Sequence, residues 1–232
     1  MQAVLAAVLV CFGLPLAAQT ISTARFAEPT DRYDHGILGD ALEWGALVLA
    51  LQDGTKITLR LPKSRVFEDF EPRLADVDGD GTPEVIVIET DIARGASLAI
   101  YDAKGKRTAT PYIGRTHRWL APLGAADLDG DGAIELAYID RPHLAKTLRI
   151  WRYQNGKLTP VADLPGLTNH QIGQDYISGG IRNCGQGHEI ITVNGNWSRL
   201  MASTLNNNAL TTRDIGAFNG RTSFATALNC AN

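Results

Sequence analysis

Short apolar segments recur along the chain, and each is followed by a polar turn. Four of them are the clearest: 46–51 (ALVLAL), 97–101 (SLAIY), 148–153 (LRIWRY) and 199–205 (RLMASTL). The turns after them centre on Gly54, Gly105, Gly156 and the pair Asn207 and Asn208. Because Gly and Asn accept a positive φ, each turn is predicted to close a β-hairpin. The three glycines are spaced 51 residues apart (105 − 54 and 156 − 105), which indicates an internal repeat.

A second apolar segment precedes each of the last three hairpin strands. These segments begin at Glu84 (EVIVIET), Glu135 (ELAYID) and Glu189 (EIITVNG). The strands are short, and no long segment has the period of an amphipathic helix, so the pattern predicts an all-β protein. A unit of about 50 residues with four short strands has the size of one β-propeller blade.

We therefore expect a β-propeller of about four blades, each a four-stranded antiparallel sheet. The final segment, 221–228 (RTSFATAL), is predicted to be a strand that completes the first blade and closes the ring. An open stack of blades, or two chains sharing one ring, is the alternative.

The first residues have the pattern of a secretory signal peptide. An uncharged apolar run extends from Ala3 to Leu14, Pro15 follows, and the small residues Ala17 and Ala18 precede polar Gln19. We expect cleavage near Ala18, so residues 1–18 are the signal and residues 19–232 form a single propeller domain. A buried helix is the alternative. No second long apolar stretch exists, so the mature chain is expected to be exported to the periplasm or outside the cell, without a membrane span.

The sequence contains three cysteines, and Cys11 lies in the apolar run of the predicted signal. Removal of that run leaves Cys184 and Cys230. An even pair in an oxidising compartment predicts one disulfide that ties the last repeat to the C-terminus. Two unpaired buried thiols are the alternative.

Two acidic loops repeat the same plan 51 residues apart: DVDGDGTPE at 76–84 and DLDGDGAIE at 127–135. Oxygen ligands at alternating places, with glycines between them, suit Ca²⁺, which takes about 6–8 oxygens. An EF-hand loop starts in the same way, but its closing glutamate stands at place 12, which here is Val87 or Tyr138. The predicted ligands are the side chains of Asp76, Asp78, Asp80, Glu84, Asp127, Asp129, Asp131 and Glu135, with the backbone carbonyl groups of Thr82 and Ala133.

The pattern Asp-x-Asp-Gly-Asp-Gly-x-x-Glu leading into a strand resembles the FG-GAP/VCBS repeats of calcium-binding β-propellers, such as integrin α-subunit heads. The resemblance implies that each loop joins neighbouring strands of a blade and binds Ca²⁺. The fourth repeat departs from it, because 181–189 (IRNCGQGHE) keeps its glycines and Glu189 but lacks the aspartates. In the first repeat, the equivalent of Asp76 is Arg25. Two calcium sites are therefore expected, and the disulfide is expected to close the fourth loop instead of a metal.

The charge balance and the absence of common catalytic motifs argue against a nucleic-acid-binding protein and against several classes of enzyme. The chain has 22 Lys and Arg against 25 Asp and Glu, with no basic stripe, so no nucleic-acid partner is expected. None of the common hydrolase, zinc-protease or phosphate-loop motifs is present. Before two predicted inner strands lie candidate ligand-binding side chains: Arg115, His117, Arg118 and His170.

We expect a secreted, non-catalytic calcium-binding module whose partner is another secreted protein or a glycan. A polysaccharide lyase or hydrolase on the same scaffold is the alternative. Convergence of the candidate ligand-binding side chains on one pocket with a carboxylate such as Asp175 would favour that enzyme.

Overall fold

The computed structural model describes residues 19–39 and 42–231, so the predicted signal peptide lies outside the described residues. The chain is built from antiparallel strands, as the hydrophobic pattern predicts. The first unit contains β1 (Ile21–Thr30), β2 (Glu43–Leu51) and β3 (Lys56–Arg60). The second contains β4 (Arg65–Phe67), β5 (Arg73–Ala75), β6 (Glu84–Asp91), β7 (Gly95–Asp102) and β8 (Gly105–Ala109).

The third unit contains β9 (Leu120–Ala126), β10 (Ile134–Asp140), β11 (Thr147–Gln154) and β12 (Lys157–Pro165). The fourth contains β13 (Leu167–Thr168), β14 (Gly180–Asn183), β15 (His188–Asn194), β16 (Arg199–Asn206) and β17 (Ala209–Ala217), and α1 (Arg221–Leu228) follows it. Neighbouring strands pair antiparallel in chain order in each of the last three units: β5 to β8, β9 to β12 and β14 to β17. This order confirms the four-stranded antiparallel repeat for these units.

The predicted hairpin turns are present. Asn155 and Gly156 join β11 to β12, and both have positive φ, 51° and 75°. Asn207 and Asn208 join β16 to β17 in the same way, with φ of 49° and 60°. Two successive residues of positive φ give the tight turn whose twist matches that of the paired strands.

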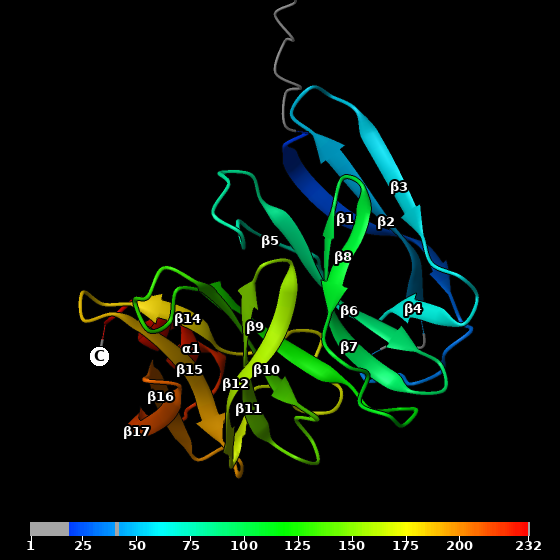
Figure 1. Ribbon diagram of the computed structural model, residues 1–232. Coiled ribbons are helices and arrows are strands. Elements are labelled where there is room, and N and C mark those ends of the chain that lie inside the picture. The colour runs from blue at the N-terminus through cyan, green and yellow to red at the C-terminus, as the bar shows by residue number, and fades with distance from the viewer. Residues whose placement is uncertain (1–18, 40–41, 232) are drawn as a thin grey trace, which may run out of the picture.

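The strands form three sheets where four were expected. Short β4 pairs with β6 and also, through Phe67, with Trp44 of β2, and it thereby joins the first two units into one eight-stranded sheet. The third unit is a separate sheet of four strands, and the fourth unit is a sheet of five. Figure 1 shows the units in chain order, with β1 to β3 and β15 to β17 at opposite ends of the molecule.

The second unit is buried on both faces because successive side chains of a strand point to opposite sides. From β6, Val85 and Val87 pack with Leu47 and Leu49 of the first unit. The intervening Ile86 and Ile88 pack into the core that the second, third and fourth units share. This double burial explains why every residue of β6 is buried and why 85–88 are four consecutive aliphatic residues.

Residues 221–228 form the helix α1, so the prediction of a closing strand in the first blade is wrong. The helix buries Phe224 and Ala227, which are three positions apart and lie on one helical face. They pack against Ile191 and Val193 of β15, with Leu200 and Ala202 of β16 in the same cluster. The C-terminal segment therefore covers the outer face of the last sheet.

Candidate functional site

The two acidic loops occupy the same place in consecutive units: 76–83 joins β5 to β6, and 127–133 joins β9 to β10. Gly79 and Gly81 have φ of 74° and 87°, and Gly130 and Gly132 have φ of 79° and 88°. L-residues with side chains rarely adopt this left-handed region, so the two glycines of each loop let the backbone turn around its carboxylates.

The first aspartate of each loop organises the backbone. Asp76 accepts hydrogen bonds from the N–H groups of Gly79 and Gly81, at 2.8 and 3.0 Å. Asp127 accepts the equivalent bonds from Gly130 and Gly132, at 2.7 and 3.0 Å. These bonds hold the glycine turns in place.

The closing glutamates are buried at the start of the following strands, Glu84 as the first residue of β6 and Glu135 as the second residue of β10. Glu84 accepts a hydrogen bond from the Val77 N–H at 3.0 Å, and Glu135 accepts one from the Leu128 N–H at 2.9 Å. Burial raises the pKa of both carboxyl groups, and hydrogen bonds only partly offset it. A neighbouring cation would stabilise their ionised forms.

Three carboxylates of each loop offer oxygens within 4.8 Å of one another: Asp76, Asp78 and Glu84, and Asp127, Asp129 and Glu135. Asp80 and Asp131 lie outside these two groups, and each accepts a hydrogen bond from the backbone two residues later. Their role as ligands, and that of the carbonyl groups of Thr82 and Ala133, stays a prediction.

The oxygen groups fit a hard divalent cation. Asp129 is about one-tenth exposed, and its Oδ1 is buried without a hydrogen-bond partner among the described residues. A buried acceptor without a partner is costly, and a cation would satisfy it. All three ligand side chains of each group are carboxylates, the donors that Ca²⁺ prefers.

Each acidic group is contacted by one arginine, and neither arginine was predicted from the sequence. Arg107 of β8 contacts Asp78 at 2.7 Å and Glu84 at 2.8 Å. Arg152 of β11 contacts three carboxylates: Asp129 at 2.6 Å, Asp131 at 3.3 Å and Glu135 at 2.5 Å. The guanidinium groups neutralise part of the charge that crowds each loop.

The fourth loop has no comparable acidic group, as its sequence predicts. Arg182 and Arg213 hold the two carboxylate oxygens of Glu189, at 2.7 and 2.5 Å. Cys184 and Cys230 form the predicted disulfide, with their Cα atoms 5.7 Å apart. Ion pairs and a covalent bond thus fix the loop that carries only one carboxylate.

A histidine-lined pocket lies at the other end of β9 from the second acidic loop. It measures about 190 Å³ and draws its walls from four separate segments of the chain. Its lining residues are His35, Ile37, His117, Arg118, Trp119, Arg141, Pro142, His143, Leu144 and Ile172. The pocket therefore lies where β9 begins and β10 ends, and the acidic loop lies at the opposite end of the same two strands.

The structure brings together only part of the predicted ligand-binding group. His117 and Arg118 line the pocket, whereas Arg115 and Asp175 are not among the lining residues. His170 is fully buried behind the wall, and its Nδ1 lies 3.0 Å from His143 Nε2. Sequence spacing alone gave no sign that His35 and His143, which are more than 100 residues apart, would lie on the same pocket.

Glu68 lies directly behind His35 and is fully buried. Its Oε1 is hydrogen-bonded to His35 Nδ1, and its Oε2 accepts a hydrogen bond from the Thr90 hydroxyl at 2.5 Å. Burial raises the pKa of Glu68 to about 8. Burial, helped by the charge of Arg118, lowers the pKa of His35 to about 4. Both pKa shifts favour the uncharged forms of Glu68 and His35 near neutral pH.

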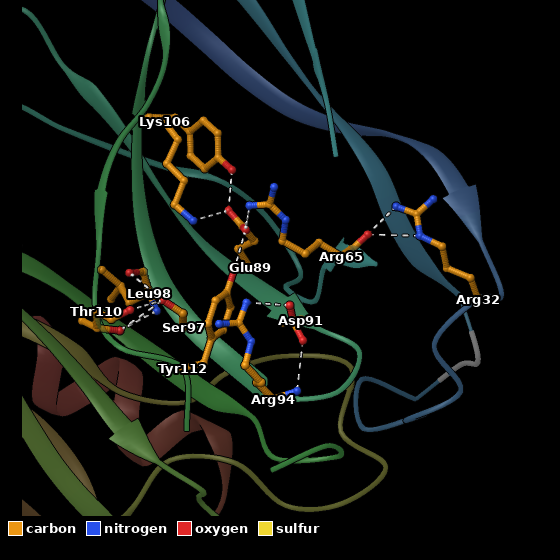
Figure 2. A network of polar contacts seen from close by, with 11 residues as sticks. Arg32, Arg65, Glu89, Asp91, Arg94, Ser97, Leu98, Lys106, Thr110 and Tyr112 are labelled. Atoms are coloured by element: carbon orange, nitrogen blue, oxygen red, sulfur yellow. Dashed lines mark hydrogen bonds and ion pairs between the residues drawn. The ribbon is translucent and has the colours of Figure 1, made fainter. Parts of the chain in front are cut away.

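A second buried carboxylate, Glu89, has a structural role. Figure 2 shows it surrounded by cationic and hydroxyl donors. Arg65, Lys106 and Tyr112 lie 2.7, 2.9 and 2.9 Å from its oxygens, and Tyr101 donates a further hydrogen bond. Burial alone would raise its pKa, but the hydrogen bonds from Tyr101, Lys106 and Arg65 outweigh burial and lower it. Glu89 is thus an ionised anchor between β4, β6, β7 and β8.

Within the described residues, no helix is long and apolar enough to cross a membrane. A search of curated proteins finds no significant match. Among solved structures, the chain is similar to the exotype rhamnogalacturonan lyase YesX, with 16% identity and a TM-score of 0.46 over 88% of this chain and 51% of that one. A Bacteroides fragilis protein, described provisionally as a 6-phosphogluconolactonase, gives 14% identity and a TM-score of 0.40, over 76% and 53%.

This chain spans about half the length of these two structures, and a likeness at this level transfers no activity. The sequence comparison is more specific. Residues 76–138 match the family of the FG-GAP-like repeat, a range that contains both acidic loops and the strands between them. Residues 76–138 are therefore identified as FG-GAP-like repeat sequence.

Proposed function

We propose that the protein is an exported, calcium-binding module of the β-propeller type that binds a protein or glycan partner without catalysing a reaction. The observation that carries this proposal is the repetition of one oxygen-rich group, Asp-Asp-Glu, in two consecutive units. Each group stands at the corner between the first two strands of a four-stranded repeat, β5 and β6 or β9 and β10, where a bound cation would fix the entry of the following strand. Asp76, Asp78 and Glu84 would hold one ion, and Asp127, Asp129 and Glu135 the other.

The disulfide supports export, because such bonds persist mainly in oxidising compartments. A propeller-type stack of blades is supported by the last three units, which share a four-stranded antiparallel plan and contribute to one common core. The helix α1 occupies the outer face of the last unit, and this supports an open stack over a ring closed by the C-terminal segment.

The lyase or hydrolase alternative has less support. Proton transfer from a sugar needs a carboxylate or imidazole placed at the reacting atom. His117 and Arg118 do meet at the pocket, but no Asp or Glu is found among its lining residues. The pocket therefore supports binding better than it supports hydrolysis by paired carboxylates.

Calorimetric titration with CaCl₂ tests the metal sites. We expect two sites in the natural sequence and one in each of two variants, Asp78→Asn and Asp129→Asn, which alter one loop apiece. Asp163→Asn is the matched control, because Asp163 is half-exposed on β12 and pairs, among the described residues, with Arg149 alone. Two sites in all three variants would show that the ions bind elsewhere, and no heat of binding would remove the calcium proposal.

Export is tested separately by N-terminal sequencing of protein recovered from the periplasm or culture medium. A mature chain that begins near Gln19 supports it. A chain that stays in the cytoplasm with its first residues intact would overturn this part of the proposal and leave the metal sites unaffected.

A further inference from the structure

The histidine-lined pocket combines apolar walls with an arginine that has no ion pair within residues 19–39 and 42–231. Arg118 forms no ion pair with any carboxylate of the described residues, and its Nη1 donates a hydrogen bond to the His117 carbonyl at 2.6 Å. Arg141, by contrast, is held by both oxygens of Asp140 at 2.8 Å. Arg118 is therefore the cation of the lining that no carboxylate of the described residues neutralises by an ion pair.

His35 adds a directed hydrogen-bond donor. Glu68 is neutral near pH 7 because burial raises its pKa to about 8, so its hydroxyl donates to His35 Nδ1. The remaining proton of the neutral imidazole then lies on Nε2, the nitrogen that is free of Glu68. Thr90 donates to the second oxygen of Glu68, which fixes the orientation of the carboxyl group. The buried acid thus sets the tautomer of the histidine that lines the pocket.

His143 does not compete for that donor. The His170 Nε2–H donates to the Gln174 carbonyl at 3.1 Å, because a carbonyl oxygen can only accept. In neutral His170 the Nδ1 atom is then an acceptor, and His143 Nε2, 3.0 Å away, donates to it. That proton of His143 is directed into the protein and not toward a ligand.

The pocket is otherwise apolar. Ile37 lines it, and the rim carries Leu144 and Ile172, which are 64% and 75% exposed although both are large aliphatic side chains. The lining residues contain no Asp, Glu, Asn or Gln. A sugar ring buried here would leave hydroxyl donors without acceptors, which costs free energy. A volume of about 190 Å³ also falls below the roughly 300–1,000 Å³ of pockets for larger ligands.

We propose that this pocket binds a carboxylate joined to an aliphatic or aromatic body, with the carboxylate at Arg118 and His35 and the body against Leu144 and Ile172. The inference deepens the proposed binding function and favours a protein partner or a small acid over a neutral glycan. The same chemistry has two sources, a free organic acid and the C-terminal carboxylate of a polypeptide that ends in an apolar residue.

Three probes separate these cases in titrations of the full chain. N-acetyl-leucine mimics a polypeptide C-terminus, 4-methylpentanoate is a free acid, and N-acetyl-leucinamide lacks the charge. Binding is followed through the imidazole signals of the histidines by NMR. We expect the signals of His35, His117 and His143 to move with either acid, and that of His188, which bonds the Asp127 carbonyl at the other end of β9, to stay in place.

Tighter binding of N-acetyl-leucine than of 4-methylpentanoate assigns the site to a polypeptide terminus, and the reverse order assigns it to a free acid. Binding of N-acetyl-leucinamide as strong as that of N-acetyl-leucine would overturn the proposal, because the charge would then contribute nothing. Absence of any shift with both acids would overturn it as well.

Arg118→Gln should weaken binding of the acids at least tenfold, whereas Arg115→Gln, which alters an exposed arginine outside the pocket, should leave it unchanged. Equal affinities of the two variants would overturn the assignment of Arg118. Calcium titration of Arg118→Gln checks that the chain is folded. Because the pocket and the loops lie at opposite ends of β9, failure of the acid titration leaves the calcium result intact, and the reverse also holds.

Discussion

Replacement of Arg152 by Gln should make the stability of the protein depend strongly on calcium. Arg152 contacts Asp129, Asp131 and Glu135, and Glu135 is fully buried. Removing one partner of a buried ion pair costs about 3–5 kcal/mol, because the other charge stays buried and uncompensated. Arg152 is itself one-sixth exposed and Asp131 half-exposed, so we take the lower end, about 3 kcal/mol.

A bound cation would take over the role of the missing guanidinium. In excess chelator, Arg152→Gln should therefore lower the free energy of unfolding by about 3 kcal/mol, or the melting temperature by about 6–12 °C for a chain of this length. In calcium at a hundred times its dissociation constant, each occupied site adds about 2.7 kcal/mol. Because the Arg152 guanidinium competes with the ion for Asp129 and Glu135, the natural sequence should bind calcium more weakly at this site than the variant does. Each tenfold difference in dissociation constant should narrow the stability difference between the two proteins by about 1.4 kcal/mol in excess calcium.

The assay is urea and thermal unfolding of both proteins in chelator and in calcium, followed by circular dichroism. Arg149→Gln is the matched control, since Arg149 lies on the same strand but pairs with Asp140 and Asp163 away from the loop. Arg149→Gln should lower the free energy of unfolding only slightly, and by the same amount in chelator and in calcium. If Arg152→Gln lost the same free energy with and without calcium, the arginine and the ion would not share one set of carboxylates, and the reasoning would be refuted.

Three further outcomes follow from the fold. Reduction of the Cys184–Cys230 disulfide should lower the free energy of unfolding by up to about 4 kcal/mol, because the bond closes a loop between cysteines 46 residues apart and so restricts the unfolded chain. Urea unfolding with reductant is compared with urea unfolding without it, and a loss below about 1 kcal/mol would contradict this reasoning. Gly95→Ala should lower the free energy of unfolding by about 3 kcal/mol or more, because the added Cβ would lie 2.2 Å from a backbone carbonyl oxygen. Gly54→Ala is the control, since Gly54 has a similar positive φ but open space around it, and should lower the free energy of unfolding by only about 1–2 kcal/mol. Equal losses in the two variants would refute the clash. The raised pKa of Glu68 means that its neutral form stabilises the fold, a contribution present below about pH 4.5 and lost as pH rises toward 8. Between pH 6.5 and 8 the natural sequence should therefore lose more stability than Glu68→Gln in parallel urea titrations, and identical slopes would show that Glu68 is ionised in the folded protein.

Much of the local structure was predictable, because it depends on residues close together in the chain. The Asn155–Gly156 and Asn207–Asn208 turns follow from the preference of these residues for positive φ. The acidic loops follow in the same way from their glycines and aspartates. The two loops also resembled FG-GAP repeats, and the match over residues 76–138 confirms that resemblance for this part of the chain.

The C-terminal segment shows where local reading failed. Residues 221–228 remained after four repeats and were predicted to close the ring as a strand, but the tertiary structure offers them an uncovered face of the last sheet. Phe224 and Ala227 reach that face together only from a helix, so burial decided the conformation. In the same way, the pairing of β4 with two units, which merges their sheets, depends on strands that are distant in sequence.

The sequence by itself determined the repeat, the turns, the cysteine pair and the composition of the two acidic loops, since each is a matter of residue type and short spacing. The tertiary structure alone decided which cations meet those loops. Arg152 lies directly opposite Glu135 in the β10–β11 register, but Arg107 reaches Glu84 from β8 at a register shift, and no repeat spacing relates the two arginines. The histidine-lined pocket is likewise a product of packing, because four distant segments meet at one end of β9. Long-range contacts of this kind depend on how the sheets stack, and the residues that make them carry no common local signal.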